Sequence, residues 1–323
     1  MDEVSRLQLE HEELTLALLH TRGEVARLQE REQLFSTLLG SVNAVLWAFD
    51  WEAQRVVYVS PAYERIFGRS AALLLASYDE WRNSIYPDDL DYAAESLAQV
   101  LETGAVEARE YRIIRSDGQL RWLSDKCFVS RQSPAGRAQI IVGIAEDITE
   151  KKQLEGELHR LATTDVLTQS SNRRHFFECA QREFEQAREY GSPLAFLLVD
   201  LDDFKLINDR YGHQMGDQVL QRLAYSGAST LRRGDLFGRI GGEEFAALFP
   251  RCEPALAMQI AERLQREVRR IRFSHEGTPF GVTLSQGLTS LRVEDLTLDA
   301  LYTRADAAMY RAKRQGKNQI VVD

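Results

Sequence analysis

Residues 194–209 read LAFLLVDLDDFKLIND, an apolar run that is followed at once by acidic, basic and amide side chains. Turn-forming residues 191–193 precede the run, so we expect a short buried strand over Leu194–Val199 that delivers Asp200 at its C-terminal end. A carboxylate in this position can bind a hard cation, because such ions prefer oxygen ligands. The backbone groups that follow, together with Lys205, then lie where a triphosphate could sit.

A second acidic segment follows further along the chain. Residues 236–249 read LFGRIGGEEFAALF, which predicts strands over Leu236–Ile240 and Phe245–Phe249, around residues 241–244. The two glycines permit a tight hairpin and let a nucleotide approach the backbone closely. If the hairpin lies beside the first strand, Asp200 and the two glutamates converge into a carboxylate cluster for one or two magnesium ions. That arrangement suits nucleotidyl transfer, in which metal ions activate a sugar hydroxyl and stabilise charge on the phosphates.

The alternative is that Asp200 caps a helix and that the hairpin is a solvated turn. Each motif alone is compatible with that interpretation, but their joint occurrence with Lys205 and Asn208 favours the metal site. The neighbouring blocks add a resemblance: residues 160–323 look like a GGDEF domain, in its GGEEF form at Gly241–Phe245. The other matching blocks are Asp165–Thr168, Asn172–Arg174, Val199–Leu220, Ser285–Gly287 and Ala305–Lys313.

The GGDEF resemblance implies an α/β fold similar to the palm of polymerases and to class III nucleotide cyclases. It also implies the activity of a diguanylate cyclase, which condenses two GTP molecules into cyclic di-GMP. Magnesium, with manganese as the alternative, is the implied cofactor. The implied metal ligands are Asp200, the Leu201 carbonyl and Glu243, with Glu244 beside them. The implied catalytic side chains are Glu243, Glu244 and Lys205.

Substrate contacts follow from the same resemblance. Asn208 and Asp217 are expected to read the guanine edge, because an amide and a carboxylate suit its carbonyl and its amino group. The expected phosphate contacts are Phe204, Lys205, Lys313 and Lys317. Lys317 stands where the family often has arginine, which keeps the charge but loses the bidentate fork.

Upstream of the hairpin, Arg232 and Asp235 form an Arg-x-x-Asp pattern. In the family this spacing marks an inhibitory site for dimeric cyclic di-GMP, where arginine suits the phosphate and aspartate the guanine edge. Arg263, on an amphipathic helix expected over Ala255–Arg270, is the implied secondary contact. The alternative is an exposed turn with surface charges. One departure is Gln169-Ser170, where the family usually has Gly-Leu, and it predicts a less well packed loop.

Residues 36–148 have a different character, with short alternating strands between turn signals. We expect two strands, several short helices and then three antiparallel strands. The expected strands include Val56–Val59, Tyr111–Ile114, Arg121–Leu123 and Ala138–Ala145, with a hairpin turn at Ser116–Gln119. This region resembles a PAS domain in its YPDD segment at Tyr86–Asp89, its RSDGQLRW hairpin and its DIT exit at Asp147–Thr149. PAS domains share a fold far more than a ligand.

Two helical segments flank the PAS-like region. Residues 1–35 carry a heptad pattern typical of a coiled coil, which predicts a homodimer; a single amphipathic helix packed on its own domain is the alternative. The seam positions are Val4, Leu7, His11, Leu14, Leu18, Thr21, Val25, Leu28, Glu32 and Phe35. Residues 149–164 predict a signalling helix, with Lys151, Leu154, Leu158 and Leu161 at three- and four-residue spacing. The expected architecture is therefore multidomain, α/β and α+β, with the cyclase-like domain over residues 165–323.

Composition limits the other possibilities. The formal net charge of −9 disfavours a general nucleic-acid binder. Three widely spaced cysteines fit neither a disulfide framework nor a zinc cluster, and we find no signal peptide or membrane-length apolar run, so we expect a cytoplasmic protein without membrane insertion. Residues 36–148 contain no histidine, and Cys127 lacks a flavin-site context, so neither haem nor flavin is expected. The four tryptophans, Trp47, Trp51, Trp81 and Trp122, are expected in the PAS core.

Three rival functions remain to be weighed. A GGDEF domain without activity, serving as a GTP or cyclic di-GMP receptor, usually has damaged carboxylates, whereas Asp200, Glu243 and Glu244 are present. A phosphodiesterase would need a further domain for which this sequence has no room. A cyclase for mixed purine products goes with loss of the guanine-reading aspartate, and Asp217 is retained. The sequence does not name the signal that the sensor detects.

Overall fold

The computed structural model describes residues 20–31, 34, 44–132 and 138–323. The chain forms two compact units, Met1–Glu155 and Gly156–Asp323. Of the expected N-terminal coiled coil, residues 20–31 are helical and Val25 and Leu28 are exposed, while the other seam positions apart from Thr21 lie outside the described residues. No helix in the described ranges combines the length and the apolar character that a membrane span requires.

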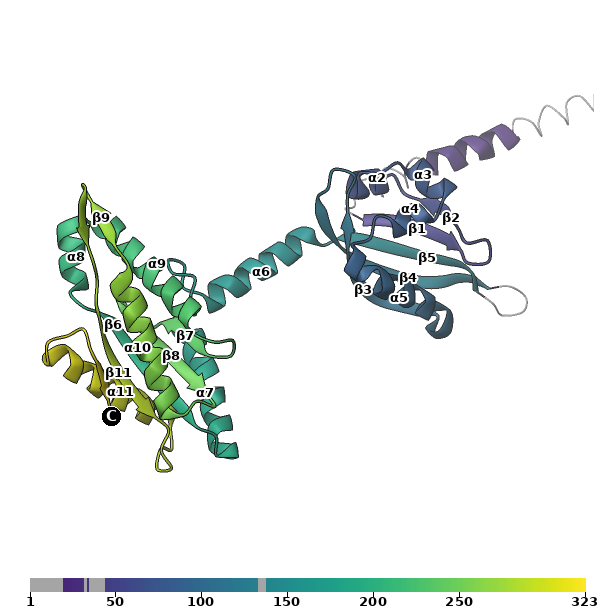
Figure 1. The fold of residues 1–323 in the computed structure, drawn as a ribbon. Coiled ribbons are helices and arrows are strands. Elements are labelled where there is room, and N and C mark those ends of the chain that lie inside the picture. The colour runs from purple at the N-terminus through teal and green to yellow at the C-terminus, as the bar shows by residue number, and fades with distance from the viewer. Residues whose placement is uncertain (1–19, 32–33, 35–43, 133–137) are drawn as a thin grey trace, which may run out of the picture. The chain divides into compact units, whose positions relative to one another are not determined.

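The first unit contains a five-stranded antiparallel sheet in the order β2-β1-β5-β4-β3 (Figure 1). The strands are β1 (Ala44–Asp50), β2 (Arg55–Val59), β3 (Ala105–Ile114), β4 (Leu120–Gln132) and β5 (Ala138–Asp147). The helices between β2 and β3 are α2 (Ala62–Phe67), α3 (Ala71–Ala76), α4 (Asp79–Arg82), the 3₁₀ turn η1 (Pro87–Asp89) and α5 (Leu90–Thr103). This is the order that the sequence predicts, two strands, short helices and three strands, with β3, β4 and β5 extending beyond their predicted bounds.

The β3–β4 hairpin turns where the Asp-Gly pair predicts it. Gly118 has a φ of +82°, and its N–H donates to the Arg115 carbonyl oxygen at 3.0 Å. Its left-handed backbone is a conformation that glycine adopts without a Cβ clash. Cys127, on β4, is buried, and burial raises the pKa of its thiol to about 11, as expected for a structural cysteine.

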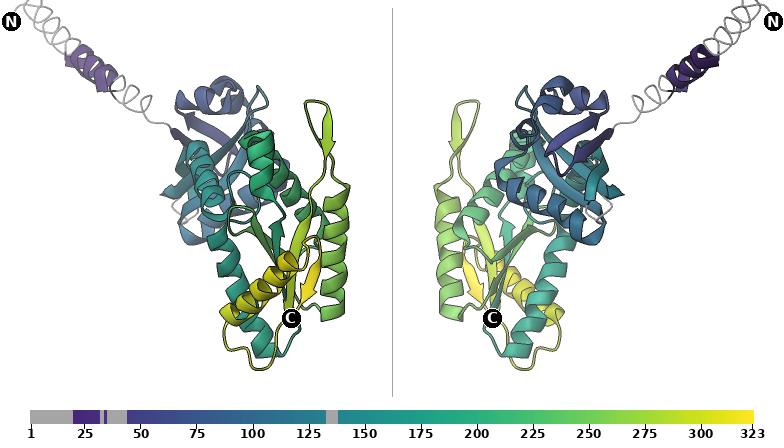
Figure 2. Two further views of the ribbon diagram at one scale, coloured as in Figure 1. Left: turned by 90° about the vertical axis from the view of Figure 1, so that its left-hand side faces the viewer. Right: turned by 90° about the vertical axis from the view of Figure 1, so that its right-hand side faces the viewer.

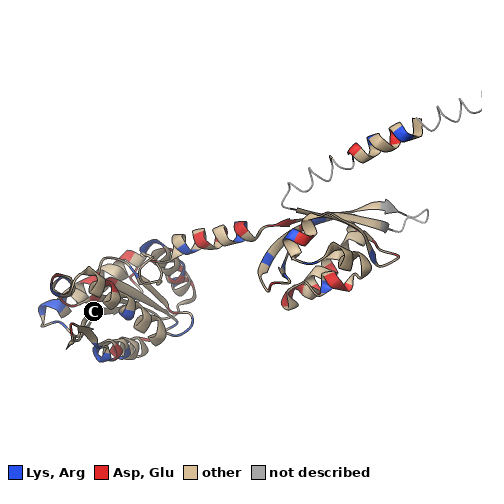
Figure 3. Ribbon diagram, turned by 90° about the horizontal axis from the view of Figure 1, so that it is seen from above, with Lys and Arg blue, Asp and Glu red and all other residues tan. Residues whose placement is uncertain are grey.

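Helix α6 (Thr149–Thr163) begins one residue after β5 and lies within the range predicted for a linker helix, whose signalling role stays a prediction. The DIT exit joins the two elements: the Asp147 carboxylate accepts the Thr149 N–H at 3.0 Å, and the Thr149 hydroxyl accepts the Trp122 N–H at 2.9 Å. Figure 3 shows acidic and basic residues interleaved along the helix. Leu154, Leu158 and Leu161 remain exposed on it.

The second unit is an α/β domain around a five-stranded sheet in the order β12-β11-β6-β8-β7. The strands are β6 (Leu194–Leu201), β7 (Leu236–Arg239), β8 (Glu244–Pro250), β11 (Leu284–Ser290) and β12 (Ile320–Val322), and β9 (Phe273–His275) and β10 (Thr278–Phe280) form a separate hairpin. The helices are α7 (Arg173–Tyr190), α8 (Phe204–Tyr211), α9 (His213–Thr230), α10 (Pro254–Arg270) and α11 (Leu298–Arg314).

Strand β6 is central and buried along its whole length, as the apolar run at its position predicts. Its side chains alternate between two cores, because successive residues of a strand point to opposite faces. Leu197 and Val199 pack with α9 and α10, whereas Phe196 and Leu198 pack with α7 and α11. Helices therefore cover both faces of the sheet (Figure 2), and the strand can carry a functional residue only where it ends.

The loop at Gln169-Ser170 is closed by backbone hydrogen bonds, while the expectation that it packs less well stays a prediction. The Asp165 N–H donates to the Ser170 carbonyl, and the Gln169 N–H donates to the Asp165 carbonyl, both at 2.8 Å. The departure from the family pattern is visible in the backbone conformation of the loop. Gln169 has a φ of +57°, in the left-handed region that glycine adopts more readily.

The Ser285–Gly287 block lies on β11 beneath α11, and its glycine permits this close approach. A Cβ atom on Gly287 would lie 2.0 Å from the Ala305 carbonyl oxygen and 2.4 Å from the Met309 nitrogen. Both are backbone atoms of a helix, so neither can move aside without moving α11. The helix and the strand can therefore pack at this distance only around a residue without a side chain.

We predict that Gly287→Ala lowers the free energy of unfolding by about 3 kcal/mol, as expected for overpacking against a fixed backbone. Chemical denaturation of the full chain, followed by circular dichroism, measures the effect. Gly281→Ala is the matched control, because its Cβ would meet only ordinary contacts, the nearest at 3.5 Å. Equal stabilities of the two variants would contradict the packing argument.

Candidate active site

The carboxylates predicted on separate strands lie at one edge of the sheet of the second unit. Strands β6 and β8 pair antiparallel, and their register sets Asp200 opposite Glu244. The Leu201 N–H donates to the Glu243 carbonyl oxygen at 3.3 Å, so the hydrogen bonding continues one residue beyond the paired strands. The adjacency on which the sequence argument depends is confirmed.

Asp200 is 3% exposed, and its carboxylate forms an ion pair with Lys313 Nζ at 2.6 Å. Burial raises the pKa of Asp200 to about 6, the Lys313 ammonium opposes that rise, and the nearby Glu243 and Glu244 carboxylates add to it. Among the described residues, no three His, Cys, Asp or Glu side chains gather closely enough to hold a metal ion. The expected convergence of three carboxylates is therefore not seen in this conformation, and a lysine lies against the central aspartate instead.

The residues nevertheless fit a divalent cation. Asp200 is buried near the Glu243 and Glu244 carboxylates, and the Lys313 ammonium balances its negative charge. An ion held by Asp200, the Leu201 carbonyl and Glu243 would meet oxygen ligands only, which magnesium prefers. Glu244 folds back over the hairpin, since a Cβ on Gly241 would lie 2.7 Å from its Oε2 atom.

The two residues predicted to read guanine lie on the neighbouring helices α8 and α9. Asn208 is half-buried on α8, and Asp217 is exposed on the second turn of α9. Between them, Gly216 passes so close to Asn208 that a Cβ atom there would lie 1.9 Å from the Asn208 Oδ1 atom. The glycine thus permits the position that the Asn208 amide occupies.

The predicted phosphate contacts surround the start of α8. Phe204 is its first residue and Lys205 is exposed in its first turn, so N–H groups of the helix N-terminus are available for an anion. Lys317 comes from the loop before β12 and pairs with Asp203 at 2.6 Å. Lys313 and Lys317 therefore both reach this corner of the domain, each against an aspartate.

Asp202 is a structural residue to which the sequence reasoning gave no role. Its buried carboxylate accepts hydrogen bonds from the Thr283 and Ser285 hydroxyls, both at 2.6 Å, and from the Asn318 N–H at 3.0 Å. It therefore joins the end of β6 to β11 and to the loop that carries Lys317. The available signal was the quoted Ser285–Gly287 block, whose serine needs a polar partner in a buried strand.

Two arginines that the sequence reasoning also missed hold the hairpin. Arg239 donates to the carbonyl oxygens of Gly241, at 3.2 Å, and Gly242, at 2.7 Å, and pairs with Asp165 at 3.2 Å. Arg173 donates to the Ile240 carbonyl at 2.8 Å. The Asp165–Thr168 and Asn172–Arg174 blocks thus support the hairpin, although nothing in their spacing indicates this partner.

The residues predicted for product binding lie near the end of α9. Arg232 pairs with Asp235 at 3.0 Å and donates to the Pro250 carbonyl at 2.6 Å. Arg263, on α10, donates to the Thr230 carbonyl, two residues before Arg232. The structure brings the three side chains to one region, but the Asp235 carboxylate accepts its hydrogen bonds from Arg232 within the turn.

Comparisons with known proteins show which families the chain resembles. Residues 162–319 match the family described as "Diguanylate cyclase, GGDEF domain", and residues 56–145 match the PAS fold. A diguanylate cyclase of Vibrio cholerae serotype O1 is 31% identical over 267 residues, which are 82% of this chain and 82% of the relative. Diguanylate cyclase DgcM of Escherichia coli (strain K12) is 38% identical over 183 residues, or 57% of this chain and 44% of that protein.

The chain also resembles solved structures over about half of its length. The coiled coil and GGDEF domain of DgcB from Caulobacter crescentus, in complex with c-di-GMP, aligns with a TM-score of 0.52 and 30% identity, covering 55% of this chain and 93% of that one. Diguanylate cyclase SiaD from Pseudomonas aeruginosa, in complex with its activator SiaC, aligns with a TM-score of 0.50 and 35% identity, covering 54% and 66%. With its carboxylates at the β6–β8 edge and a PAS-fold region ahead of them, the chain belongs to the GGDEF family of diguanylate cyclases, enzymes that produce cyclic di-GMP.

Proposed function

We propose that this chain condenses two GTP molecules into cyclic di-GMP, with release of two pyrophosphates, at the β6–β8 edge of its GGDEF domain. The observation that carries the proposal is the register that sets Asp200 opposite Glu244, with Lys313 at 2.6 Å from Asp200. Nucleotidyl transfer needs carboxylates that hold metal ions and cationic groups that neutralise the negative charge of the phosphates. This edge of the sheet offers both.

In each transfer, the 3′-oxygen of one GTP forms a bond to the α-phosphorus of the other, and the bond from that phosphorus to pyrophosphate breaks. The hydroxyl proton must leave as the new bond forms, and Glu244, beside the hairpin, is the proposed acceptor. Magnesium held by Asp200, the Leu201 carbonyl and Glu243 would lower the pKa of the hydroxyl and stabilise charge on the phosphates. Once GTP is bound, the Lys313 ammonium would leave Asp200 and contact the phosphates instead.

The remaining residues position the nucleotide. Asn208 and Asp217 are proposed to bind the guanine edge. The close approach of Asn208 to Gly216, the residue before Asp217, supports this proposal. Phe204 and Lys205 are proposed to bind phosphates at the start of α8, because a helix N-terminus favours anions. Retention of Asp217 favours a guanine product over a mixed purine product.

Two copies of the chain are needed, since cyclic di-GMP contains two equivalent phosphodiester bonds and one domain offers one site. We propose a homodimer organised by the N-terminal helix and α6, which raises the effective concentration of the two domains to roughly millimolar. The exposed leucines of α6, Leu154, Leu158 and Leu161, support a second copy as the partner. The PAS domain would regulate turnover by shifting this helix, so that the two sites move in or out of apposition.

Product inhibition is the last part of the proposal. Cyclic di-GMP is proposed to bind to Arg232, Asp235 and Arg263, away from the residues assigned to the metal ion. The exposed guanidinium of Arg232 supports this role, although its bonds to Asp235 and to the Pro250 carbonyl must then be exchanged for the ligand. The proposed gain is a charge-assisted contact between arginine and phosphate.

The decisive experiment is to incubate the purified full chain with magnesium and GTP and to identify the product by chromatography. We predict that Asp200→Asn and Glu243→Gln each lower turnover at least about 100-fold, because each removes a charged ligand from the proposed metal site. Asp209→Asn, an exposed acid on α8, is the matched control and should keep full activity. GTP binding without any product in the wild type would favour the receptor function instead.

We predict that Gly216→Ala raises the KM for GTP about tenfold with a smaller change in kcat, because the new methyl group displaces the Asn208 amide by which guanine is bound. Thermal stability should not fall, since alanine favours helix over glycine. Gly156→Ala on α6, where a Cβ would meet nothing within 4 Å, is the control. An unchanged KM with a lower kcat would count against the guanine role of Asn208.

We predict that Arg232→Ala raises the product concentration that halves the rate at least about tenfold, while the initial rate stays within a factor of about two. Progress curves at increasing added cyclic di-GMP measure both quantities. Arg233→Ala, the exposed neighbour, controls for loss of a positive charge from the same turn. Identical inhibition of the wild type and both variants would refute the inhibitory site.

A further inference from the structure

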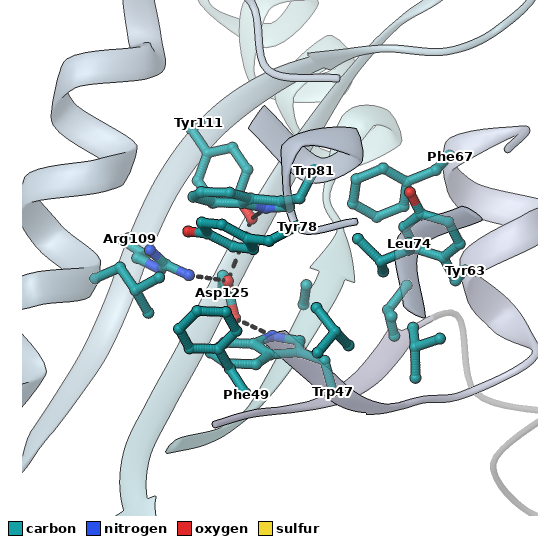
Figure 4. Close-up of a pocket in the computed structure, with 15 residues that line it drawn as sticks. Trp47, Phe49, Tyr63, Phe67, Leu74, Tyr78, Trp81, Arg109, Tyr111 and Asp125 are labelled. Atoms are coloured by element: carbon teal, nitrogen blue, oxygen red, sulfur yellow. Dashed lines mark hydrogen bonds and ion pairs between the residues drawn. The ribbon is translucent and has the colours of Figure 1, made fainter. Parts of the chain in front are cut away.

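The core of the PAS domain encloses a cavity of about 40 Å³, bounded by the sheet and the short helices (Figure 4). One water molecule needs about 10–15 Å³ of such space, so the cavity has room for roughly three waters. The wall is largely aromatic: Trp47 and Phe49 come from β1, and Tyr78 and Trp81 stack with ring centroids 5.2 Å apart. The tryptophans expected in the core thus include two that line this cavity.

A buried ion pair lies in the cavity wall. Arg109 on β3 and Asp125 on β4 are register partners, their side chains 2.6 Å apart and almost fully buried. Asp125 also accepts the Trp47 indole N–H at 3.0 Å and the Tyr111 hydroxyl at 3.2 Å. Its carboxylate is therefore well supplied with donors and has little need of a cationic ligand.

Arg109 is less well satisfied. One terminal nitrogen donates to Asp125, and the other donates to the Ala93 carbonyl at 2.9 Å. Its Nε–H, however, has no hydrogen-bond partner among the residues that the structure describes. The side chain is 2% exposed, and a buried donor on a charged group left without an acceptor is costly. The hydroxyl of Tyr63, which also lines the cavity, lacks a partner in the same described set.

The surroundings disfavour a further negative charge. Arg109 and Asp125 already form a neutral pair, so an anion would leave one uncompensated charge in a buried site. Burial raises the pKa of Tyr78 to about 12, and it raises the pKa of Tyr63 and Tyr111 as well, because a phenolate loses its hydration in this buried wall. An acceptor without charge satisfies the Arg109 donor and avoids this penalty.

We propose that the PAS cavity is a binding site for a compact, uncharged and largely apolar molecule whose carbonyl oxygen accepts the Arg109 Nε–H. The aromatic wall supplies the apolar contacts, and the charged donor fixes the orientation of the molecule. A ligand with few non-hydrogen atoms binds weakly, so we expect dissociation constants of about 1 mM for minimal probes. This inference concerns the PAS unit and does not depend on the proposed catalytic function.

Three probes of matched size and shape separate the contributions to binding. 2-Butanone has a neutral carbonyl, 2-methyl-1-butene replaces that oxygen with a methylene group, and propionate replaces a methyl group with a charged oxygen. Each is titrated into the full chain labelled with 5-fluorotryptophan and followed by ¹⁹F NMR. Trp47 and Trp81 line the cavity, whereas Trp122 does not and is the internal reference. Single Trp→Phe variants assign the resonances.

We predict that 2-butanone shifts the Trp47 and Trp81 resonances, leaves Trp122 unchanged, and binds at least about tenfold more tightly than either other probe. Equal binding of butanone and the alkene would show an apolar site only, and tighter binding of propionate would show an anion site. Absence of any shift up to the solubility limits would mean that only water occupies the cavity. Each of these three outcomes overturns the proposal.

Two variants test the assigned donor. Arg109→Lys keeps a positive charge beside Asp125 but has no Nε–H group, so the roughly tenfold preference for butanone over the alkene should disappear. Tyr63→Phe removes the other unpaired donor and should keep the preference. The reverse pattern would overturn the role of Arg109. If Arg109→Lys does not fold, the comparison of the three probes in the wild type decides the proposal alone.

Discussion

The antiparallel pairing of β6 with β8 is the constraint on which the catalytic half of this molecule depends. Because β6 is buried on both faces, its side chains are committed to packing along its length and it can present a reactive group only at its end. The pairing then brings the hairpin acids to that same end, with Asp200 opposite Glu244. Much of the remaining site consists of residues that keep this edge in place: Asp202 binds β11, and Arg239 holds the hairpin carbonyls.

Local patterns predict most of the elements because each is decided by residues close in sequence. The apolar run of β6, the glycine hairpin and the Asp-Gly turn at residue 118 all lie where the sequence indicates. The supporting contacts could not be predicted in this way. Asp202 meets Thr283 and Ser285 more than eighty residues away, with separations of 81 and 83, and no spacing rule connects them. The Lys313–Asp200 pair is not predicted either, because the family resemblance assigns Asp200 to a metal ion and Lys313 to a phosphate.

Charge explains why the two units use their buried aspartates so differently. In the PAS unit, Asp125 is matched by Arg109 and by indole and phenol donors, and the result is a neutral, well-connected pair in an aromatic wall. In the GGDEF unit, Asp200 has a single lysine and two nearby glutamates, so negative charge remains in excess. The first arrangement suits an uncharged occupant, and the second suits a cation.

The contacts of Asp202 also bear on the order in which the cyclase domain forms. Its carboxylate joins the end of β6 to Asn318, 116 residues later in the chain. Closing so long a loop is entropically costly and slow, whereas helices and the β7–β8 hairpin form from local contacts. The corner that carries Asp200, Asp203 and Lys317 is therefore expected to be among the last parts of the domain to become ordered during folding. A partly folded chain would then have its helices and the β7–β8 hairpin but not the completed corner around Asp200.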